Sequence, residues 1–171
     1  MQEKERTNSY VSKYKVWPVC PHCKQEATLV GAEYIYPHRE DLAGDCMWLC
    51  EPCDAYVSCH KKGAWFFVNG VKHISDGTLP KGTLANGELR FARKRVHNLL
   101  DPLWRYEDDK QYARKTVYKW LSNEMKLPYY DTHVGFFDVA QCQQALEILK
   151  KRTAGNLSIQ SQLRIQNWNK R

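Results

Sequence analysis

Apolar residues in the second half of the chain recur at three- and four-residue steps, which is the spacing of one face of an α-helix. The first series consists of Leu89, Ala92, Val96, Leu99 and Leu103. Thr83 or Asn86 is a possible cap for this helix, and Pro102 stops or kinks it. A second helix is predicted from about Asp109 to Met125. Its expected buried positions are Tyr112, Val117, Trp120 and Leu121.

The third helix has the clearest start signal. Asp138 and Gln141 stand three residues apart, in the spacing of a capping box. The apolar positions that follow are Val139, Cys142, Ala145, Leu146 and Leu149. From residue 150 to 171 the chain is basic, contains no acidic residue and is rich in Asn and Gln. We expect this stretch to be a tail that is disordered, or helical only when bound.

The first half of the chain has the chemistry of strands. β-Branched and aromatic residues predict a strand over residues 27–36, which Pro37 ends. Residues 46–50 and 55–59 predict two more strands. Together the three form a small antiparallel sheet.

A hairpin is predicted after this sheet. Residues 64–68 form its first strand, the dipeptide Asn69-Gly70 its turn, and residues 71–74 its return strand. Turn-forming residues at 76–82 then mark the boundary to the helices.

Four of the seven cysteines form two Cys-x-x-Cys pairs, Cys20 with Cys23 and Cys50 with Cys53. Each pair places two thiolates on one tight turn, and two such turns supply the tetrahedral sulfur ligands that Zn²⁺ prefers. Four thiolates leave no coordination position for a water molecule, so the predicted zinc ion is structural. A redox role for the pairs is not favoured, because no βαβ pattern surrounds them.

Three further potential ligands lie close to the second pair, namely Cys46, Cys59 and His60. A substituted ligand or a second metal site is one interpretation. We expect instead that they pack beside the first site, because soft side chains commonly fill small cores. One zinc ion per chain is therefore predicted.

Composition and charge narrow the class of function. Hydrophobic residues make up 43% of the chain and aromatic residues 12%, which is enough for a sizeable core. The formal net charge of +7 favours an acidic partner such as nucleic acid, although a basic surface can also serve only solubility. No secretory signal or membrane-spanning run is visible, so we expect a cytoplasmic protein with reduced cysteines and no membrane partner.

These patterns predict an α+β protein in four parts. A flexible lead covers residues 1–15, and a zinc ribbon with a hairpin insertion covers 16–82. A domain of about three helices covers 83–149, and the basic tail covers 150–171.

Several motifs of the chain occur together in one known family. They are Cys-Pro-His-Cys at 20–23, the segments 48–60, 82–86 and 101–104, Leu89-Arg90, Arg93-Lys94, His97, Tyr118-Lys-Trp-Leu121, the segment 133–138 and Cys142. Over about residues 18–149 the chain resembles zinc-finger-containing proteins of phages and prophages. It departs from that family at Ser58, where Gly is usual, and in a longer segment between His60 and Gly82. The resemblance implies a zinc-binding protein of phage or prophage origin in a bacterial host cell, with no established activity.

A polar stripe adjoins the apolar face of the first predicted helix. Its members are Arg90, Lys94, His97 and Asp101. His97 and Asp101 could pair, with the carboxylate fixing the imidazole tautomer as a general base requires. With His60 and His133, this pair could form a nuclease-like hydrolytic centre, and a solvated helix face is the alternative. We expect no catalysis, because no nucleophile elbow, phosphate loop or open metal triad accompanies these residues.

The predicted function depends on the basic and aromatic residues of the chain, because cations can bind phosphates and aromatic rings can stack on bases. The expected nucleic-acid contacts are Arg90, Arg93, Lys94, Arg114, Lys115, Lys150, Lys151 and Arg152. Acidic residues at 107–109 interrupt this charge. The predicted function is that of a non-catalytic, zinc-stabilised protein that contacts DNA or RNA. The alternative is an adaptor or inhibitor that binds a host protein through Trp65, Phe66 and Phe67, unless the protein's own core buries these rings.

Overall fold

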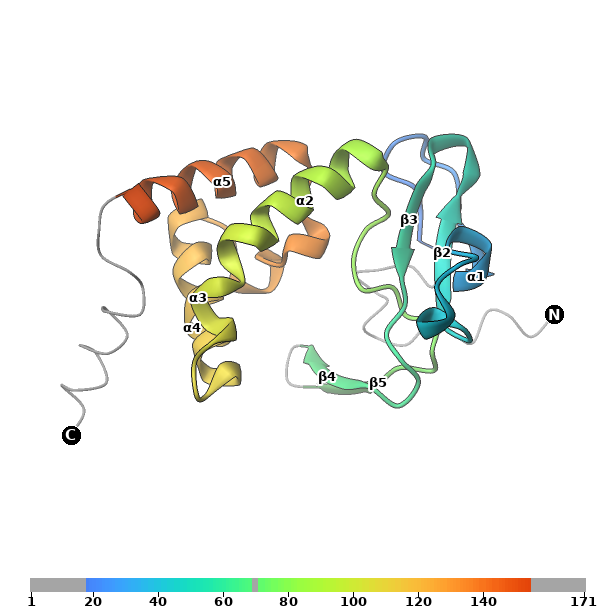
Figure 1. The fold of residues 1–171 in the computed structure, drawn as a ribbon, viewed down its shortest axis with the longest axis horizontal. Coiled ribbons are helices and arrows are strands. Elements are labelled where there is room, and N and C mark those ends of the chain that lie inside the picture. The colour runs from blue at the N-terminus through green and yellow to red at the C-terminus, as the bar shows by residue number, and fades with distance from the viewer. Residues whose placement is uncertain (1–17, 69–70, 155–171) are drawn as a thin grey trace. The chain divides into compact units, whose positions relative to one another are not determined.

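The computed structural model describes residues 18–68 and 71–154, and for residues 66–68, 71–73, 153 and 154 it describes the backbone only. The chain divides into two compact units, Met1–Gly87 and Glu88–Arg171, each described by itself below (Figure 1). The expected flexible lead, the Asn69-Gly70 turn and residues 155–171 of the expected tail lie outside the described residues. The fold is α+β, as predicted: a small antiparallel sheet followed by helices.

The sheet of the first unit has three antiparallel strands in the order β1-β2-β3. They are β1 (Thr28–Gly31), β2 (Cys46–Cys50) and β3 (Ala55–Ser58). Trp48 in the central strand pairs with Leu29 on one side and with Val57 on the other. The two later strands match their predicted positions, so this unit is the expected ribbon.

The prediction of one strand over residues 27–36 is wrong in its second half. After Gly31 the chain forms a short helix, α1 (Ala32–Ile35), and then a 3₁₀ turn, η3 (Glu40–Leu42). Because Gly31 pairs with Cys46, the first residue of β2, the residues after Gly31 have no partner strand. Their backbone groups are satisfied locally instead, as in the hydrogen bond from the Tyr36 N–H to the Ala32 carbonyl at 2.9 Å.

The predicted hairpin is present. It consists of β4 (Trp65–Val68) and β5 (Val71–Ile74). Val68 pairs with Val71, which leaves a two-residue connection. The ladder continues toward the ribbon, because the Ser75 N–H donates to the Ala64 carbonyl at 2.8 Å.

Trp48 is the largest residue of the ribbon's small core and is only 2% exposed. Its indole N–H donates to the Thr78 carbonyl at 2.7 Å, so the buried donor is satisfied. Ala27, Ala55 and Leu84 pack in the same cluster, together with Cys20, Cys50 and Cys59. Cysteines therefore supply a large share of this core.

Four helices form the second unit. They are α2 (Gly87–Leu100), α3 (Pro102–Arg105), α4 (Lys110–Met125) and α5 (Val139–Ala154). Two 3₁₀ turns, η5 (Tyr129–Asp131) and η6 (Val134–Phe136), connect the last two helices. Pro102 acts as predicted: α2 ends at Leu100, and the proline occupies the first position of α3, where its missing N–H costs nothing.

The core of the helical unit is apolar. Its fully buried side chains include Val96, Leu100, Val117, Leu121, Phe137 and Leu149. Tyr112, predicted as buried, is 47% exposed, because it lies in the first turn of α4 on the solvent side. Among the described residues, no helix is long and apolar enough to cross a membrane.

The caps of the last two long helices follow the sequence signals. The Asp109 carboxylate accepts the Tyr112 N–H at 2.9 Å, at the start of α4. Asp138 and Gln141 form the predicted capping box, with reciprocal hydrogen bonds of 2.9 and 2.7 Å.

The end of α5 corrects the predicted start of the tail. The helix continues to Ala154, so residues 150–154 belong to it. Leu149 is buried, and the Arg152 guanidinium lies 4.2 Å from the centre of the Trp120 ring. These contacts hold the last turns of α5 in the folded unit.

Candidate metal centre

The first cysteine pair lies on a knuckle before β1. A bridge between Val19 and Glu26 closes it, and inside it the Cys20 N–H donates to the Gln25 carbonyl at 2.8 Å. Lys24 adopts a left-handed φ of 64°, a conformation that costs a residue other than glycine about 1–2 kcal/mol. This reversal turns the chain back toward the strand that follows.

The second pair lies at the end of β2. Cys50 is the last residue of the strand, and Pro52 lies in the 3₁₀ turn η4 (Glu51–Cys53) that follows. Asp54 then has a left-handed φ of 45°, and its N–H donates to the Glu51 carbonyl at 3.0 Å. Both knuckles thus share one feature, because a left-handed residue directly follows the second cysteine of each pair.

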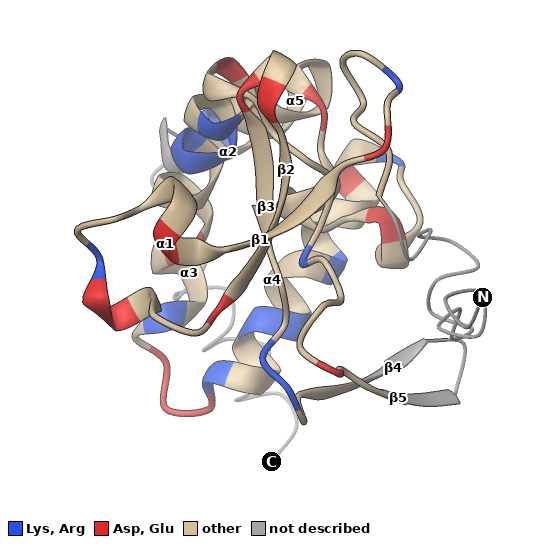
Figure 2. Ribbon diagram, turned by 90° about the vertical axis from the view of Figure 1, so that its right-hand side faces the viewer, with Lys and Arg blue, Asp and Glu red and all other residues tan. Residues whose placement is uncertain are grey.

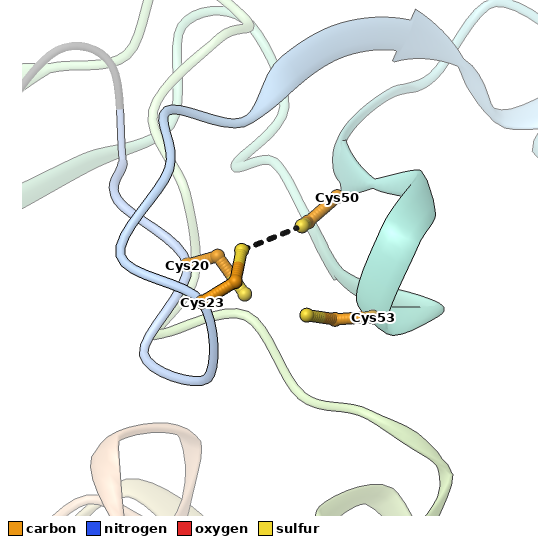
Figure 3. A group of neighbouring side chains, drawn as sticks. All are labelled: Cys20, Cys23, Cys50 and Cys53. Atoms are coloured by element: carbon orange, nitrogen blue, oxygen red, sulfur yellow. Dashed lines mark hydrogen bonds between the residues drawn. The ribbon is translucent and has the colours of Figure 1, made fainter.

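The two knuckles bring the four thiols together. Figure 3 shows the side chains of Cys20 and Cys23 facing those of Cys50 and Cys53, and all four sulfur atoms lie within 4.8 Å of one another. A tetrahedral zinc ion with Zn–S bonds of about 2.3 Å requires sulfur atoms about 3.8 Å apart. The sulfur atoms of Cys23 and Cys50 are 3.4 Å apart, so the cluster needs only a small adjustment to hold the ion.

The pKa values of Cys23, Cys50 and Cys53 differ because hydrogen bonds and burial act differently on each thiol. A hydrogen bond from the Gln25 backbone, with a second one from Cys50, lowers the pKa of Cys23 to about 7. Burial raises the pKa of Cys50, and hydrogen bonding with Cys23 raises the pKa of Cys53 to about 12. One thiolate forms readily, whereas four negative charges at this distance require the positive charge of the metal.

The three neighbouring candidates are not part of this group. The Cys59 thiol is 6% exposed and donates to the Thr78 carbonyl at 3.5 Å, and its N–H donates to the Cys46 carbonyl. His60 is half-buried, and burial lowers its pKa. In the part of the chain that the structure describes, the four knuckle cysteines are the one cluster of three or more metal-binding side chains.

A family model described as a zinc-finger-containing domain matches residues 16–152. That match covers most of the 171 residues. The chain belongs to this family. No curated protein and no solved structure matches it. Cys20, Cys23, Cys50 and Cys53 form the zinc site of this zinc-finger-containing domain, and because all four ligands are thiolates the site is structural.

The candidate catalytic residues are only partly brought together. The His97 Nδ1 lies 3.1 Å from Asp101 Oδ1, as the spacing predicted, but the other oxygen of Asp101 accepts from Arg105 at 2.9 Å. His133 lies among aromatic rings, 5.5 Å from the centre of the Tyr118 ring. His60 belongs to the other unit. Asp101 thus contacts both His97 and Arg105 on the surface of the unit, and we propose no catalysis from His97 and Asp101.

The predicted nucleic-acid contacts differ in exposure. Lys94, Arg114, Lys115, Lys150 and Lys151 are exposed, whereas Arg90 and Arg152 are half-buried. The Arg114 guanidinium lies 4.8 Å from the centre of the Tyr118 ring.

Arg93 is a correction to that set. It is 9% exposed, and its Nε and Nη2 donate to the Phe137 carbonyl at 3.0 and 2.9 Å. Burial lowers the pKa of Arg93 to about 10. The side chain therefore connects α2 to the segment before α5 and is not available to a phosphate.

The residues predicted to bind a protein partner lie on β4. Trp65 is 60% exposed, so the protein's own core does not bury it. The side chains of Phe66 and Phe67 lie outside the described part.

Two exposed residues of α2 were missed by the prediction of site residues. Phe91 is 65% exposed, and the Arg95 guanidinium lies 5.8 Å from the centre of its ring. The signal was present in the sequence, because Phe91 falls outside the apolar series that begins at Leu89.

Proposed function

We propose that this zinc-finger-containing domain is a non-catalytic protein that binds DNA or RNA through exposed cations of its helical unit. The observation that carries the proposal is the unequal charge of the two units. Residues 1–87 contain ten Asp and Glu and ten Lys and Arg, whereas residues 88–171 contain sixteen Lys and Arg against nine Asp and Glu. Four thiolates around Zn²⁺ add a charge of about −2 to the ribbon. Phosphates are therefore attracted to the helices and not to the zinc site.

The cations of the helical unit are accessible. Lys94 and Arg95 lie on α2 and Lys115 and Lys119 on α4, and all four are exposed. Figure 2 shows blue Lys and Arg segments on both helices. Within the described ranges 18–68 and 71–154, no acidic group lies within ion-pair distance of Lys94 or Arg95. Exposed cations without such partners can neutralise phosphates at little cost in broken contacts.

A binding measurement with a matched control tests this proposal. The Lys94→Ala/Arg95→Ala double variant of the full chain should bind a fluorescein-labelled oligonucleotide more weakly than the wild type. The slope of log affinity against log salt concentration is negative, and each lost phosphate contact should make it less steep by about 0.7 to 0.9.

The control removes the same charge from the ribbon. Lys61→Ala/Lys62→Ala should leave affinity and salt slope unchanged, because both lysines lie in the unit without net positive charge. Equal losses in the two double variants would show only a response to net charge. Absence of binding by the wild type at low salt would reject the proposal.

The hairpin supports a second candidate function. Trp65 and Ile74 pair across β4 and β5 and are 60% and 61% exposed, so two apolar side chains lie together on the surface. Exposed aromatic and aliphatic pairs of this kind are typical anchors for a protein partner. In the phage or prophage setting that the resemblance implies, this partner is a protein of the bacterial host.

The two functions differ in their response to salt and to substitution. Trp65→Ala should remove binding to a host protein, with little salt dependence, and should leave oligonucleotide affinity unchanged. A pull-down from bacterial lysate with wild-type and Trp65→Ala protein tests this, and identical captured proteins would count against the hairpin as a binding site.

A further inference from the structure

We propose that the exposed face of α2 recognises single-stranded nucleic acid by stacking an unpaired base on Phe91. This inference rests on the proposed function and names the strand state of the ligand. Phe91 is 65% exposed, although burial of an aromatic ring stabilises a folded protein. A stacked base would cover the ring that the fold leaves in water.

The ring lies opposite the core side of the helix. Leu89, Val96 and Leu100 are buried and define that side, and at 100° per residue Phe91 projects almost directly away from it. No rearrangement of the core is needed for a ligand to reach the ring.

The residues around Phe91 complete a binding face. Lys94, Arg95 and Asn98 follow it at three, four and seven residues, so all four side chains share one side of the helix, and all are exposed. The Arg95 guanidinium lies 5.8 Å from the ring centre. An aromatic platform with two cations and an amide beside it can hold a base by stacking and the adjoining backbone by charge.

The chemistry favours an unpaired base over a duplex. A phenyl ring has no hydrogen-bonding group with which to read base edges in a groove, and the bases of a duplex already stack on one another. In a single strand the faces of the bases are accessible, and this holds for both DNA and RNA.

A related arrangement occurs on α4. Tyr112 is 47% exposed, and the exposed Lys115 and Lys119 follow it at three and seven residues. An aromatic ring followed by cations on the same helix side thus appears twice in the unit that carries the positive charge. Two such platforms suit a single strand, in which successive bases can stack at separate points.

The experiment compares strand states with the full chain. Anisotropy is measured with a labelled single-stranded DNA of mixed sequence, with the same strand annealed to its complement, and with the RNA of that sequence. Phe91→Ala should weaken binding of both single strands about 5- to 150-fold, the range expected for one stacked base. Binding of the duplex should not change.

Three variants make the result specific. Phe91→Trp should retain single-strand affinity and Phe91→Leu should not, because stacking needs a flat ring and not merely apolar volume. Tyr106→Ala is the matched control, since Tyr106 is 74% exposed but precedes the acidic residues 107–109. It should leave affinity for every probe unchanged.

The outcomes separate this inference from the proposed function. Suppose that the wild type binds and that Phe91→Ala either lowers the affinity for single strands and duplex equally or changes neither affinity. The strand-state inference is then overturned, and the proposal of phosphate binding stands. If Phe91→Ala instead abolishes self-association in sedimentation and leaves all affinities unchanged, a second copy of the chain covers this face and the inference is overturned. If the wild type binds no probe at low salt, both proposals fail.

Discussion

The ribbon and the helical unit of this zinc-finger-containing domain are each stabilised by different interactions. The ribbon has a small core in which cysteines contribute much of the buried surface, and its two knuckles contain left-handed residues at Lys24 and Asp54. The helical unit has an apolar core, capped helices and the buried side chain of Arg93 satisfied by a backbone carbonyl. From this difference we expect that zinc binding is needed to fold the ribbon and that the helical unit stays folded without the metal.

Removing one zinc ligand should unfold the ribbon and leave the helical unit folded. Cys50→Ala should lose the bound zinc and the folded ribbon, because apparent binding free energies of structural zinc sites are about 10–16 kcal/mol. Helical circular dichroism should remain, since the helices hold no zinc ligand. Elemental analysis for zinc and NMR spectra of the ribbon amides measure the two effects.

Cys142→Ala is the matched control for that experiment. Cys142 is fully buried in the helical unit, so its replacement should lower the stability of that unit and leave one zinc ion per chain. A Cys50→Ala protein that keeps its zinc would contradict the assignment of the ligand. Collapse of both units on zinc removal would contradict the division between them.

Alanine substitution of Arg93 should mainly lower stability, whereas alanine substitution of Lys94 should mainly lower oligonucleotide affinity. Arg93→Ala removes both donors of the buried Phe137 carbonyl and should lower the free energy of unfolding by about 1–3 kcal/mol. Its effect on oligonucleotide affinity should be small. Lys94→Ala should weaken affinity and change stability by less than about 0.5 kcal/mol.

Urea unfolding and anisotropy on the same two proteins test this contrast. The measurements are made under conditions in which both variants are folded. A folded Arg93→Ala protein that binds more weakly than Lys94→Ala would show that the buried guanidinium reaches the ligand, and would reject our correction.

Alkaline pH should destabilise the helical unit through Cys142. Burial, opposed by the nearby charge of Arg93, raises the pKa of the Cys142 thiol to about 11. The unfolded chain loses this proton near pH 8.5, so the stabilising contribution is complete below about pH 8.5 and is lost as the pH rises toward 11. Unfolding of the wild type and of Cys142→Ala across this window measures the effect, and identical slopes in the two proteins would contradict it.

Loss of the capping box of Asp138 and Gln141 should have the smallest effect on stability. Asp138→Ala removes the hydrogen bond to the Gln141 N–H and should lower the unfolding free energy by about 1 kcal/mol, without changing zinc content. Glu147→Ala, at an exposed position inside α5, is the control and should change stability by less than about 0.5 kcal/mol. Equal effects of the two substitutions would mean that the box contributes nothing specific.

Features governed by local spacing were predictable from the sequence. The two Cys-x-x-Cys pairs and the box of Asp138 and Gln141 each depend on a few adjacent residues, so their chemistry can be recognised before the fold is known. The positions of β2, β3 and the hairpin followed in the same way from short runs of strand-forming residues.

Features that depend on distant partners were not predictable. Arg93 has the charge and the helix position of a surface cation, but its acceptor is a carbonyl 44 residues away in sequence. The strand predicted to Tyr36 ends at Gly31 because its partner strand begins at Cys46, which local composition does not reveal.

The most direct test of the division between the units is an NMR titration of the zinc-loaded full chain with single-stranded DNA. Amide signals from Phe91 to Asn98 and from the basic positions of α4 should shift as DNA is added. Signals of the two cysteine knuckles should stay in place, because the proposed phosphate contacts all lie on the helical unit. Shifts centred on the knuckles, with α2 unaffected, would contradict the central claim.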